Sequence, residues 1–191
     1  DGAVRIAVGR AGNVIGGGDW AQDRIIPDCV RSWAKGKSVQ LRNPLATRPW
    51  QHVLEPLSGY LALATELHQK DELHGEPFNF GPSVHQNRTV LSLVKEMSGY
   101  WDKVRWEDNS GDEKEPYESG LLKLNCDKAL YHLNCQAILS FKETVKMTAE
   151  WYCPYYVDPS TIRDVTLAHT GEYVSMAQKQ GMMWALSLLN I

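Results

Sequence analysis

The sequence predicts an α/β fold, because short strand-like segments alternate with helix-like segments along most of the chain. In the helix-like segments apolar residues recur at three- and four-residue intervals, whereas the strand-like segments are short apolar runs that end in glycine- or arginine-bearing loops. Of the 191 residues 43% are apolar, which is enough to bury a sizeable core.

The first predicted element is a buried strand over residues 3–8, which consist almost entirely of apolar side chains. It leads into a glycine-dense loop over residues 10–20, where permissive backbone angles allow close approach to a ligand. The strand follows Asp1 and Gly2 directly, so we expect the chain to begin partway through a fold.

A helix and a strand should follow the glycine loop. Pro27 suits the first turn of a helix that runs to about Lys35, and Gly36 is a natural stop. Residues 39–42 then read as a short strand, and the loop after it carries Arg48.

The next helix is expected to open at Pro56 and to bury one face. The apolar side chains spaced for that face are Leu57, Tyr60, Leu61, Ala64 and Leu67. Beyond it, residues 78–81 predict a strand and residues 89–99 an amphipathic helix. The polar, acidic stretch 107–118 predicts a surface loop, and residues 121–125 predict another strand.

The C-terminal third should be helical. Asp127 is placed to cap a short helix that ends at Leu133, and Ser140 with Glu143 forms a capping box ahead of a longer helix that Pro154 should end. The remaining stretch has helical composition, and we expect Gly171 and Gly181 to break it.

Composition excludes several classes of protein. The net charge is −3 with scattered basic residues, so the broad basic face of a nucleic-acid-binding protein is absent and no nucleic-acid partner is expected. No apolar stretch approaches the ~18 residues needed to span a bilayer, and no signal-peptide layout opens the chain. We therefore expect a soluble cytoplasmic protein with no membrane partner.

The four cysteines, Cys29, Cys126, Cys135 and Cys153, stand far apart without a C-x-x-C pair, so no metal site is predicted and the thiols should be reduced and inert. His52 lies in an apolar stretch, which favours a buried, hydrogen-bonded histidine over a catalytic one. The seven tryptophans do not cluster with basic residues and are expected in the core or at an interface.

The glycine loop does not match the dinucleotide fingerprint G-x-G-x-x-G. Its glycines have the wrong spacing, no apolar helix follows directly, and no acidic residue ends a second strand. We expect a loop shaped for another part of a ligand.

The loops after the predicted strands carry guanidinium and amide groups, the groups that suit a diphosphate and a sugar. These candidate side chains are Arg10, Asn13, Arg24, Arg42, Arg48 and Asn79. In open α/β sheets ligands bind at this edge, although an arginine in a loop is also often solvated or paired with a carboxylate.

Four runs of residues resemble one known family. They are residues 10–28 (RAGNVIGGGDWAQDRIIPD), residues 41–61 from LRNP to RPWQHVLEPLSGYL, residues 78–82 (FNFGP) and residues 150–152 (EWY). In sequence and in order along the chain, these runs resemble the CDP-glucose 4,6-dehydratases of the extended short-chain dehydrogenase/reductase superfamily. The resemblance covers about residues 4–156.

The resemblance implies the C-terminal end of a Rossmann-like doubly wound sheet plus a small mixed α/β substrate-binding domain. Residues 1–60 would be a remnant of the Rossmann-like domain interleaved with substrate-domain elements. Residues 61–157 would form the sugar-nucleotide-binding domain and residues 158–191 a C-terminal helical extension.

The resemblance also implies an NAD-dependent lyase of deoxysugar biosynthesis for lipopolysaccharide O-antigen, which converts CDP-glucose to a 4-keto-6-deoxy sugar nucleotide and water. The family's catalytic Tyr-x-x-x-Lys pair is absent, since no tyrosine of this chain has a lysine four residues later. No catalytic residue is therefore assigned, and we expect the chain to be inactive alone, with a CDP-sugar as its ligand and a homo-oligomer as its state.

By resemblance, Asn13 approaches the sugar or the diphosphate, Arg24 and Arg48 approach the phosphates, and Arg42 and Asn79 approach the nucleotide end. Arg10 and Ala11 are expected near the nicotinamide edge of NAD. The chain departs from the family over residues 117–124 and 135–139, which puts the contacts of the first stretch in question.

Two other readings stay open. Much of this architecture is shared with sugar-nucleotide epimerases and reductases. A non-catalytic fragment that self-associates through an exposed sheet edge is the second.

Overall fold

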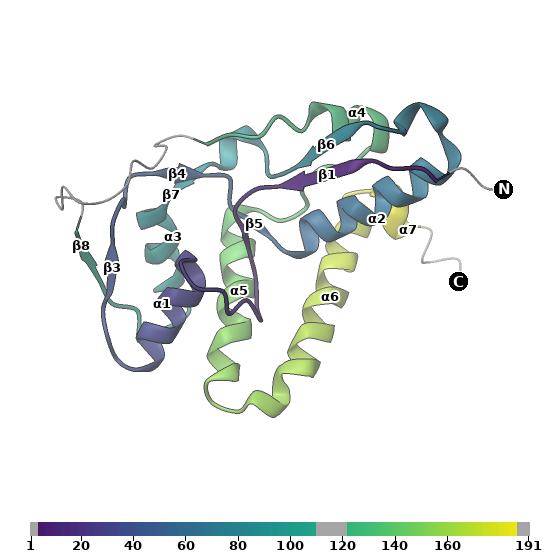
Figure 1. The fold of residues 1–191 in the computed structure, drawn as a ribbon. Helices are drawn as coiled ribbons and strands as arrows, with labels where there is room; N and C mark the ends of the chain where they lie inside the picture. The colour runs from purple at the N-terminus through teal and green to yellow at the C-terminus, as the bar shows by residue number, and fades with distance from the viewer. Residues whose placement is uncertain (1–3, 110–121, 187–191) are drawn as a thin grey trace.

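A computed structural model describes residues 4–109 and 122–186 (Figure 1). Its strands are β1 (Val8–Ala11), β2 (Val14–Ile15), β3 (Val39–Leu41), β4 (Thr47–Arg48), β5 (Gln51–His52), β6 (Pro77–Phe80), β7 (Arg88–Thr89) and β8 (Trp106–Asp108). Its α-helices are α1 (Ile25–Ala34), α2 (Leu54–Gln69), α3 (Val90–Met97), α4 (Asp127–Leu133), α5 (Phe141–Tyr155), α6 (Ile162–Lys179) and α7 (Met183–Leu186). Short 3₁₀ helices cover Asp71–Leu73, Val84–Gln86 and Pro159–Thr161.

The strands pair two by two. β1 runs parallel to β6, β2 to β5 and β3 to β8, while β4 and β7 are antiparallel. Each parallel partner comes from far along the chain, as crossover connections require. The predicted α/β class is therefore confirmed.

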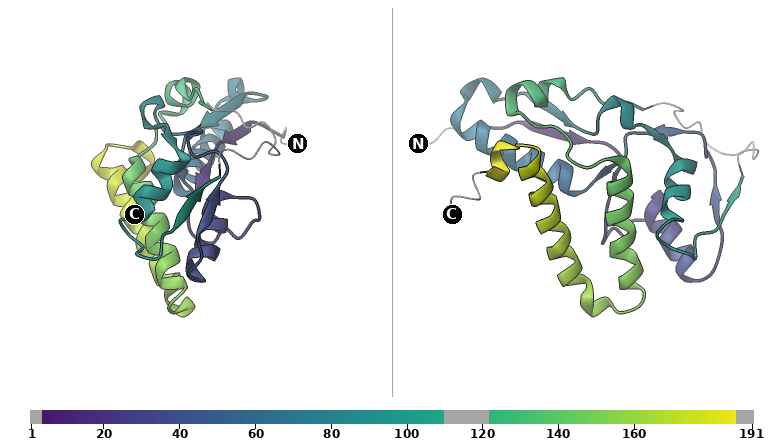
Figure 2. Two further views of the ribbon diagram at one scale, coloured as in Figure 1. Left: turned by 90° about the vertical axis from the view of Figure 1, so that its left-hand side faces the viewer. Right: turned by 180° about the vertical axis from the view of Figure 1, so that it is seen from behind.

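The helices pack around these strand pairs. α5 packs against β2 and β5, and α6 returns beside it as an antiparallel partner. The two helices extend together away from the strands (Figure 2). α2 lies along β1 and β6. The principal core lies between α1, α3 and α5, around Trp33, Met97 and Tyr152, all of which are fully buried.

Two smaller cores complete the packing. One joins α5, α6 and α7 around Met147, Tyr173 and Ala177. The other lies between α2, α4 and β6 around Leu73 and Phe78.

Most helix boundaries follow local sequence signals. α1 begins directly after Arg24 with Pro27 in its first turn, and Gly36, at φ +67°, follows its end. The capping box is formed, because Ser140 Oγ accepts from the backbone of Glu143 and the Glu143 carboxylate accepts from the backbone of Ser140. α5 runs one residue past Pro154.

Several predicted elements differ from the structure. The first strand occupies Val8–Ala11 instead of residues 3–8, and Val4 and Ile6 are exposed. Residues 122–125 form no strand, since their backbone joins no ladder within the described chain; Leu121 and residues 110–118 of the predicted acidic loop lie outside the described residues. α4 is preceded by Cys126 as its N-cap, so Asp127 is its first residue instead of its cap.

The burial predicted for α2 is wrong. Leu57, Tyr60 and Leu61 lie on its exposed side, while the buried side carries Glu55, Pro56, Gly59 and Leu63. Gly59 lies against Phe80, and a Cβ there would come within 2.3 Å of that ring. The helix therefore approaches β6 through a glycine. The spacing of the apolar residues alone predicted that the opposite face of the helix would be buried.

The predicted helix break at Gly171 is also wrong, because α6 continues through it. A single glycine costs about 1 kcal/mol in a helix, which the packing of Tyr173 and Ala177 on α5 and α7 outweighs. Gly181, at φ +74°, does end the helical stretch.

Candidate functional site: a cavity at the start of α1

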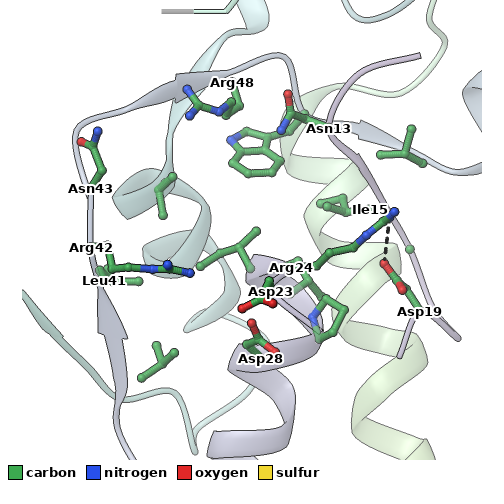
Figure 3. Close-up of a pocket in the computed structure, with 18 of the residues that line it drawn as sticks. Asn13, Ile15, Asp19, Asp23, Arg24, Asp28, Leu41, Arg42, Asn43 and Arg48 are labelled. Atoms are coloured by element: carbon green, nitrogen blue, oxygen red, sulfur yellow. Dashed lines mark hydrogen bonds and ion pairs between the residues drawn. The ribbon is translucent and has the colours of Figure 1, made fainter. Parts of the chain in front are cut away.

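A cavity of about 1020 Å³ opens between the β1–β2 turn, the start of α1, and the segment that runs from β3 to Trp50 (Figure 3). This volume is at the upper end of the range typical of small-molecule sites. Its walls come from segments that follow β1, β2 and β3, the edge where ligands are expected in an open α/β arrangement.

The cavity gathers most of the side chains chosen from the sequence. Asn13, Arg24, Arg42 and Arg48 all line it, although they come from segments up to 35 positions apart in the sequence. Figure 3 draws Arg42 and Arg48 on one side of the opening, and it draws Arg24 on the other side with its guanidinium turned toward Asp19. The lining therefore brings three cations together with three carboxylates, so guanidinium groups that can bind an anion lie in a cavity whose formal charges balance.

The arginines differ in their surroundings. Arg48 is buried, with its Nη1 donating to the carbonyl of Thr47 at 2.9 Å. Arg24 is exposed and pairs with Asp19, whose Oδ2 lies 3.3 Å from its Nη1. Burial strengthens the electrostatic interactions of the Arg48 guanidinium, whereas an exposed ion pair such as Arg24–Asp19 gives little stabilisation.

Asn13 has a strained backbone and an unsatisfied side chain. It adopts φ 49°, in the left-handed region that asparagine tolerates better than most residues. Its Oδ1 is buried, and no hydrogen-bond donor reaches it within the part of the chain that is described. A buried acceptor without a partner is costly, so a ligand hydroxyl or amide would satisfy it.

Of the other three predicted site residues, only one lines this cavity. Ala11 lines the cavity, whereas Arg10 is exposed on β1 and is not part of the lining. Asn79 lies on β6, where its amide donates to the carbonyl of Asn125 at 3.0 Å, and it lines a second, much smaller pocket. The structure therefore does not bring Arg10 and Asn79 into the arginine-lined cavity.

Three carboxylates in the lining were not chosen from the sequence. Asp19, Asp23 and Asp28 lie at the start of α1 beside Arg24. The sequence did carry a signal for these carboxylates. The three aspartates are spaced four and five residues apart around Arg24, so they share its loop and the first turn of the helix that follows.

The glycine loop is closed by packing. A Cβ at Gly17 would lie 2.0 Å from two ring atoms of Trp151, and one at Gly16 would lie 2.8 Å from Val53. These glycines make room for α5 and α2, so they do not form an open cradle for a phosphate. At these two positions the loop therefore leaves no open space for the diphosphate of NAD.

Two buried titratable side chains, His52 and Glu55, lie outside the lining of the cavity. Burial lowers the pKa of His52 to about 4, with nearby His169 adding to the effect. Burial raises the pKa of Glu55 to about 7, although backbone amides of Ile138 and Leu139 and the hydroxyl of Tyr173 donate to its carboxylate. The predicted buried, hydrogen-bonded His52 is confirmed, since its Nδ1 accepts from the amide of Leu54.

Within residues 4–109 and 122–186, no group of three or more histidine, cysteine or acidic side chains is placed to hold a metal ion. None of the described helices is both long and apolar enough to cross a bilayer.

Solved structures with a similar fold are nucleotide-sugar enzymes. A UDP-glucuronic acid 4-epimerase from Bacillus cereus, in complex with UDP-glucuronic acid and NAD, matches with a TM-score of 0.64 at 16% identity over 80% of this chain and 46% of its own. A dTDP-glucose 4,6-dehydratase from Bacillus anthracis, in complex with NAD, matches with a TM-score of 0.60 at 21% identity over 83% of this chain and 47% of its own. These matches confirm the fold as the C-terminal portion of a Rossmann-like dehydratase or epimerase structure.

The sequence itself is similar to one of these enzyme classes. A CDP-glucose 4,6-dehydratase of Salmonella typhimurium is 43% identical over 150 residues, which are 78% of this chain and 41% of that protein. The resemblance predicted from the sequence is confirmed, and the chain spans about two-fifths of the length of the relative it matches. No protein-family model matches the sequence.

Proposed function

We propose that this chain is the CDP-sugar-binding part of a CDP-glucose 4,6-dehydratase. The proposed parent reaction converts CDP-glucose to CDP-4-keto-6-deoxyglucose and water, with NAD as its cofactor. The single observation that carries the proposal is the convergence of Arg24, Arg42 and Arg48 on one cavity.

The chemistry of the lining supports a nucleotide sugar. A diphosphate carries two negative charges, and guanidinium groups bond phosphate oxygens two at a time. The buried Arg48 and the unsatisfied Oδ1 of Asn13 would serve the diphosphate and a neighbouring hydroxyl. Ala11 at the cavity wall and Arg10 beyond it are proposed to face the nicotinamide.

Catalysis is proposed to depend on groups outside these residues. No tyrosine here has a lysine four positions later, and the glycine loop is filled by Trp151 and Val53. We therefore derive no hydride-transfer step from the described residues, and the isolated chain is proposed to bind without turnover.

A related epimerase is the second candidate, since several structures with this fold are epimerases. The 43% identity to a dehydratase favours the first. Product analysis of a complete protein that contains this chain separates them: a dehydratase forms a 4-keto-6-deoxy sugar nucleotide, whereas an epimerase returns an isomer of the substrate.

Calorimetric titration of the chain with CDP and with CDP-glucose tests the binding proposal. Arg48→Gln removes a buried cation and should weaken CDP binding by about tenfold or more, since losing one charge-assisted bond costs about 1.5–3 kcal/mol. Arg163→Gln, on exposed α6 away from the cavity, is the matched control and should leave binding unchanged. Absence of binding at millimolar CDP and CDP-glucose would contradict the proposal.

A further inference from the structure

Two carboxylates form the part of the cavity that lies away from Arg48 and Asn13. Asp28 lies in the first turn of α1, and Asp23 lies just before that helix at φ 59°. Both line the cavity, and Figure 3 draws them together below the arginines. Neither is explained by an anionic ligand, because a carboxylate repels a diphosphate.

The orientation of Asp28 is fixed by its neighbour. Arg31 Nη1 lies 2.9 Å from Asp28 Oδ1, and Arg31 Nη2 donates to the carbonyls of Trp20 and Ala21. This pair holds the carboxylate against the loop that precedes α1. Within the described chain no donor reaches Asp28 Oδ2, so that oxygen remains available to a ligand.

A carboxylate oxygen that faces the cavity can gain a direct contact with a ligand only where the ligand offers a hydrogen-bond donor. Cytosine presents an amino group, N4, where uracil presents the carbonyl oxygen O4, and aspartate is a natural acceptor for the cytosine amine. The amine has two hydrogens, which matches two acceptors. With uracil the same carboxylates would face the carbonyl oxygen O4, which is also an acceptor, so no hydrogen bond could form.

We propose that Asp28, assisted by Asp23, accepts hydrogen bonds from the exocyclic amine of cytosine and makes this cavity select cytidine over uridine diphosphates. This inference rests on the proposed function, because it takes the arginine-lined part of the cavity as the diphosphate site. It assigns base specificity to the start of α1 and leaves the phosphates to the arginines.

Paired calorimetric titrations of the 191-residue chain with CDP and with UDP, at one salt concentration, test the assignment. The unmodified chain should bind CDP about tenfold or more tightly than UDP, the scale of one good base-edge contact. Asp28→Asn should bring the two affinities within about threefold, because an amide accepts from cytosine and donates to uracil equally well. Asp23→Asn should lower the ratio less.

Asp71→Asn is the matched control. Asp71 is also paired with an arginine, Arg5, but lies away from the cavity, so its substitution should leave the CDP-to-UDP ratio unchanged. The ratio separates recognition from folding, since a loss of structure weakens both nucleotides together.

Two results would overturn the assignment while the proposed function stands. One is equal affinity of the unmodified chain for CDP and UDP, and the other is an unchanged ratio in Asp28→Asn, even with both affinities reduced. If neither nucleotide binds, the diphosphate site itself fails and the inference falls with it.

Discussion

Glu55 and His52 lie three residues apart in the chain, and burial shifts their pKa values in opposite directions. Glu55, raised from 4.5 to about 7, takes up its proton in the folded state first, so its contribution to stability grows as the pH falls from 7 towards 4.5. His52, lowered from 6.5 to about 4, is protonated first in the unfolded state, so its contribution is lost as the pH falls from 6.5 towards 4.

The two effects should nearly cancel in the unmodified chain. Between pH 8 and pH 5 each amounts to about 2 kcal/mol of unfolding free energy, of opposite sign. Relative to its own value at pH 8, His52→Gln should gain stability on acidification and Glu55→Gln should lose it. Urea denaturation at pH 5, 6, 7 and 8 measures both, and parallel profiles in the two variants would contradict these pKa shifts.

Gly17 is a glycine for a steric reason. Because a Cβ there would overlap the root of the Trp151 ring, Gly17→Ala should lower the free energy of unfolding by about 2 kcal/mol or more. Gly171→Ala is the matched control: nothing lies within 4 Å of its Cβ position inside α6, and it should stabilise by about 1 kcal/mol. Thermal or chemical denaturation gives both signs, and a neutral Gly17→Ala would show that Trp151 moves aside.

At the scale of elements, Tyr173 ties α6 to α2. Its hydroxyl donates to Glu55 Oε2 at 3.0 Å, while Glu55 also holds the amides of Ile138 and Leu139 ahead of α5. One carboxylate thus joins three segments that are distant in the sequence.

Removing that hydroxyl tests the tie. Tyr173→Phe should cost about 2 kcal/mol of unfolding free energy, because a buried carboxylate oxygen loses a donor. Tyr131→Phe, at a ring that is 85% exposed on α4, should change stability by less than about 0.5 kcal/mol. Equal effects in the two variants would mean that the Tyr173 hydroxyl contributes nothing specific.

Elements were predicted correctly where the sequence signal was local, and they were predicted wrongly where packing against distant residues determines the structure. The proline at the start of α1 and the capping box of α5 act within one turn, so they were readable. The face of α2 is set by Gly59 against Phe80, and the strand position of β1 is set by its pairing with β6; neither partner is adjacent in the sequence.

The same limit applies to the cavity. The arginines and Asn13 could be predicted because the glycine loop and the segment around Arg48 carry recognisable sequence motifs. Arg24, Arg42, Arg48 and Asn13 all line one cavity in the structure. Asp28 and Asp23 were not predicted, because in a sequence an acidic residue near an arginine is most simply interpreted as its ion-pair partner. Only the structure shows that both carboxylates line the cavity.

At the scale of the whole molecule, β1 and α2 together expose an apolar surface. Among the described strands β1 pairs with β6 alone, and Val8 at its start is exposed, as are Val4 and Ile6 in the segment before it. α2, which carries the exposed Leu57 and Leu61, lies along β1 (Figure 1), and its Tyr60 lies against Gly9 of that strand. An unpaired strand edge flanked by apolar side chains favours association.

We therefore expect the chain on its own to self-associate through this surface, with a second copy covering it. Light scattering should give a mass above that of one chain at high concentration, and the double substitution Leu57→Glu with Leu61→Glu should shift it towards the monomer, because it puts charges where apolar area is buried. Leu167→Glu, equally exposed but on α6, is the control and should have no effect. Added NAD should leave the association unchanged, since Trp151 and Val53 fill the space at Gly17 and Gly16 of the glycine loop. A monomer at every concentration, or association that survives the double substitution, would show that this surface is not where copies meet.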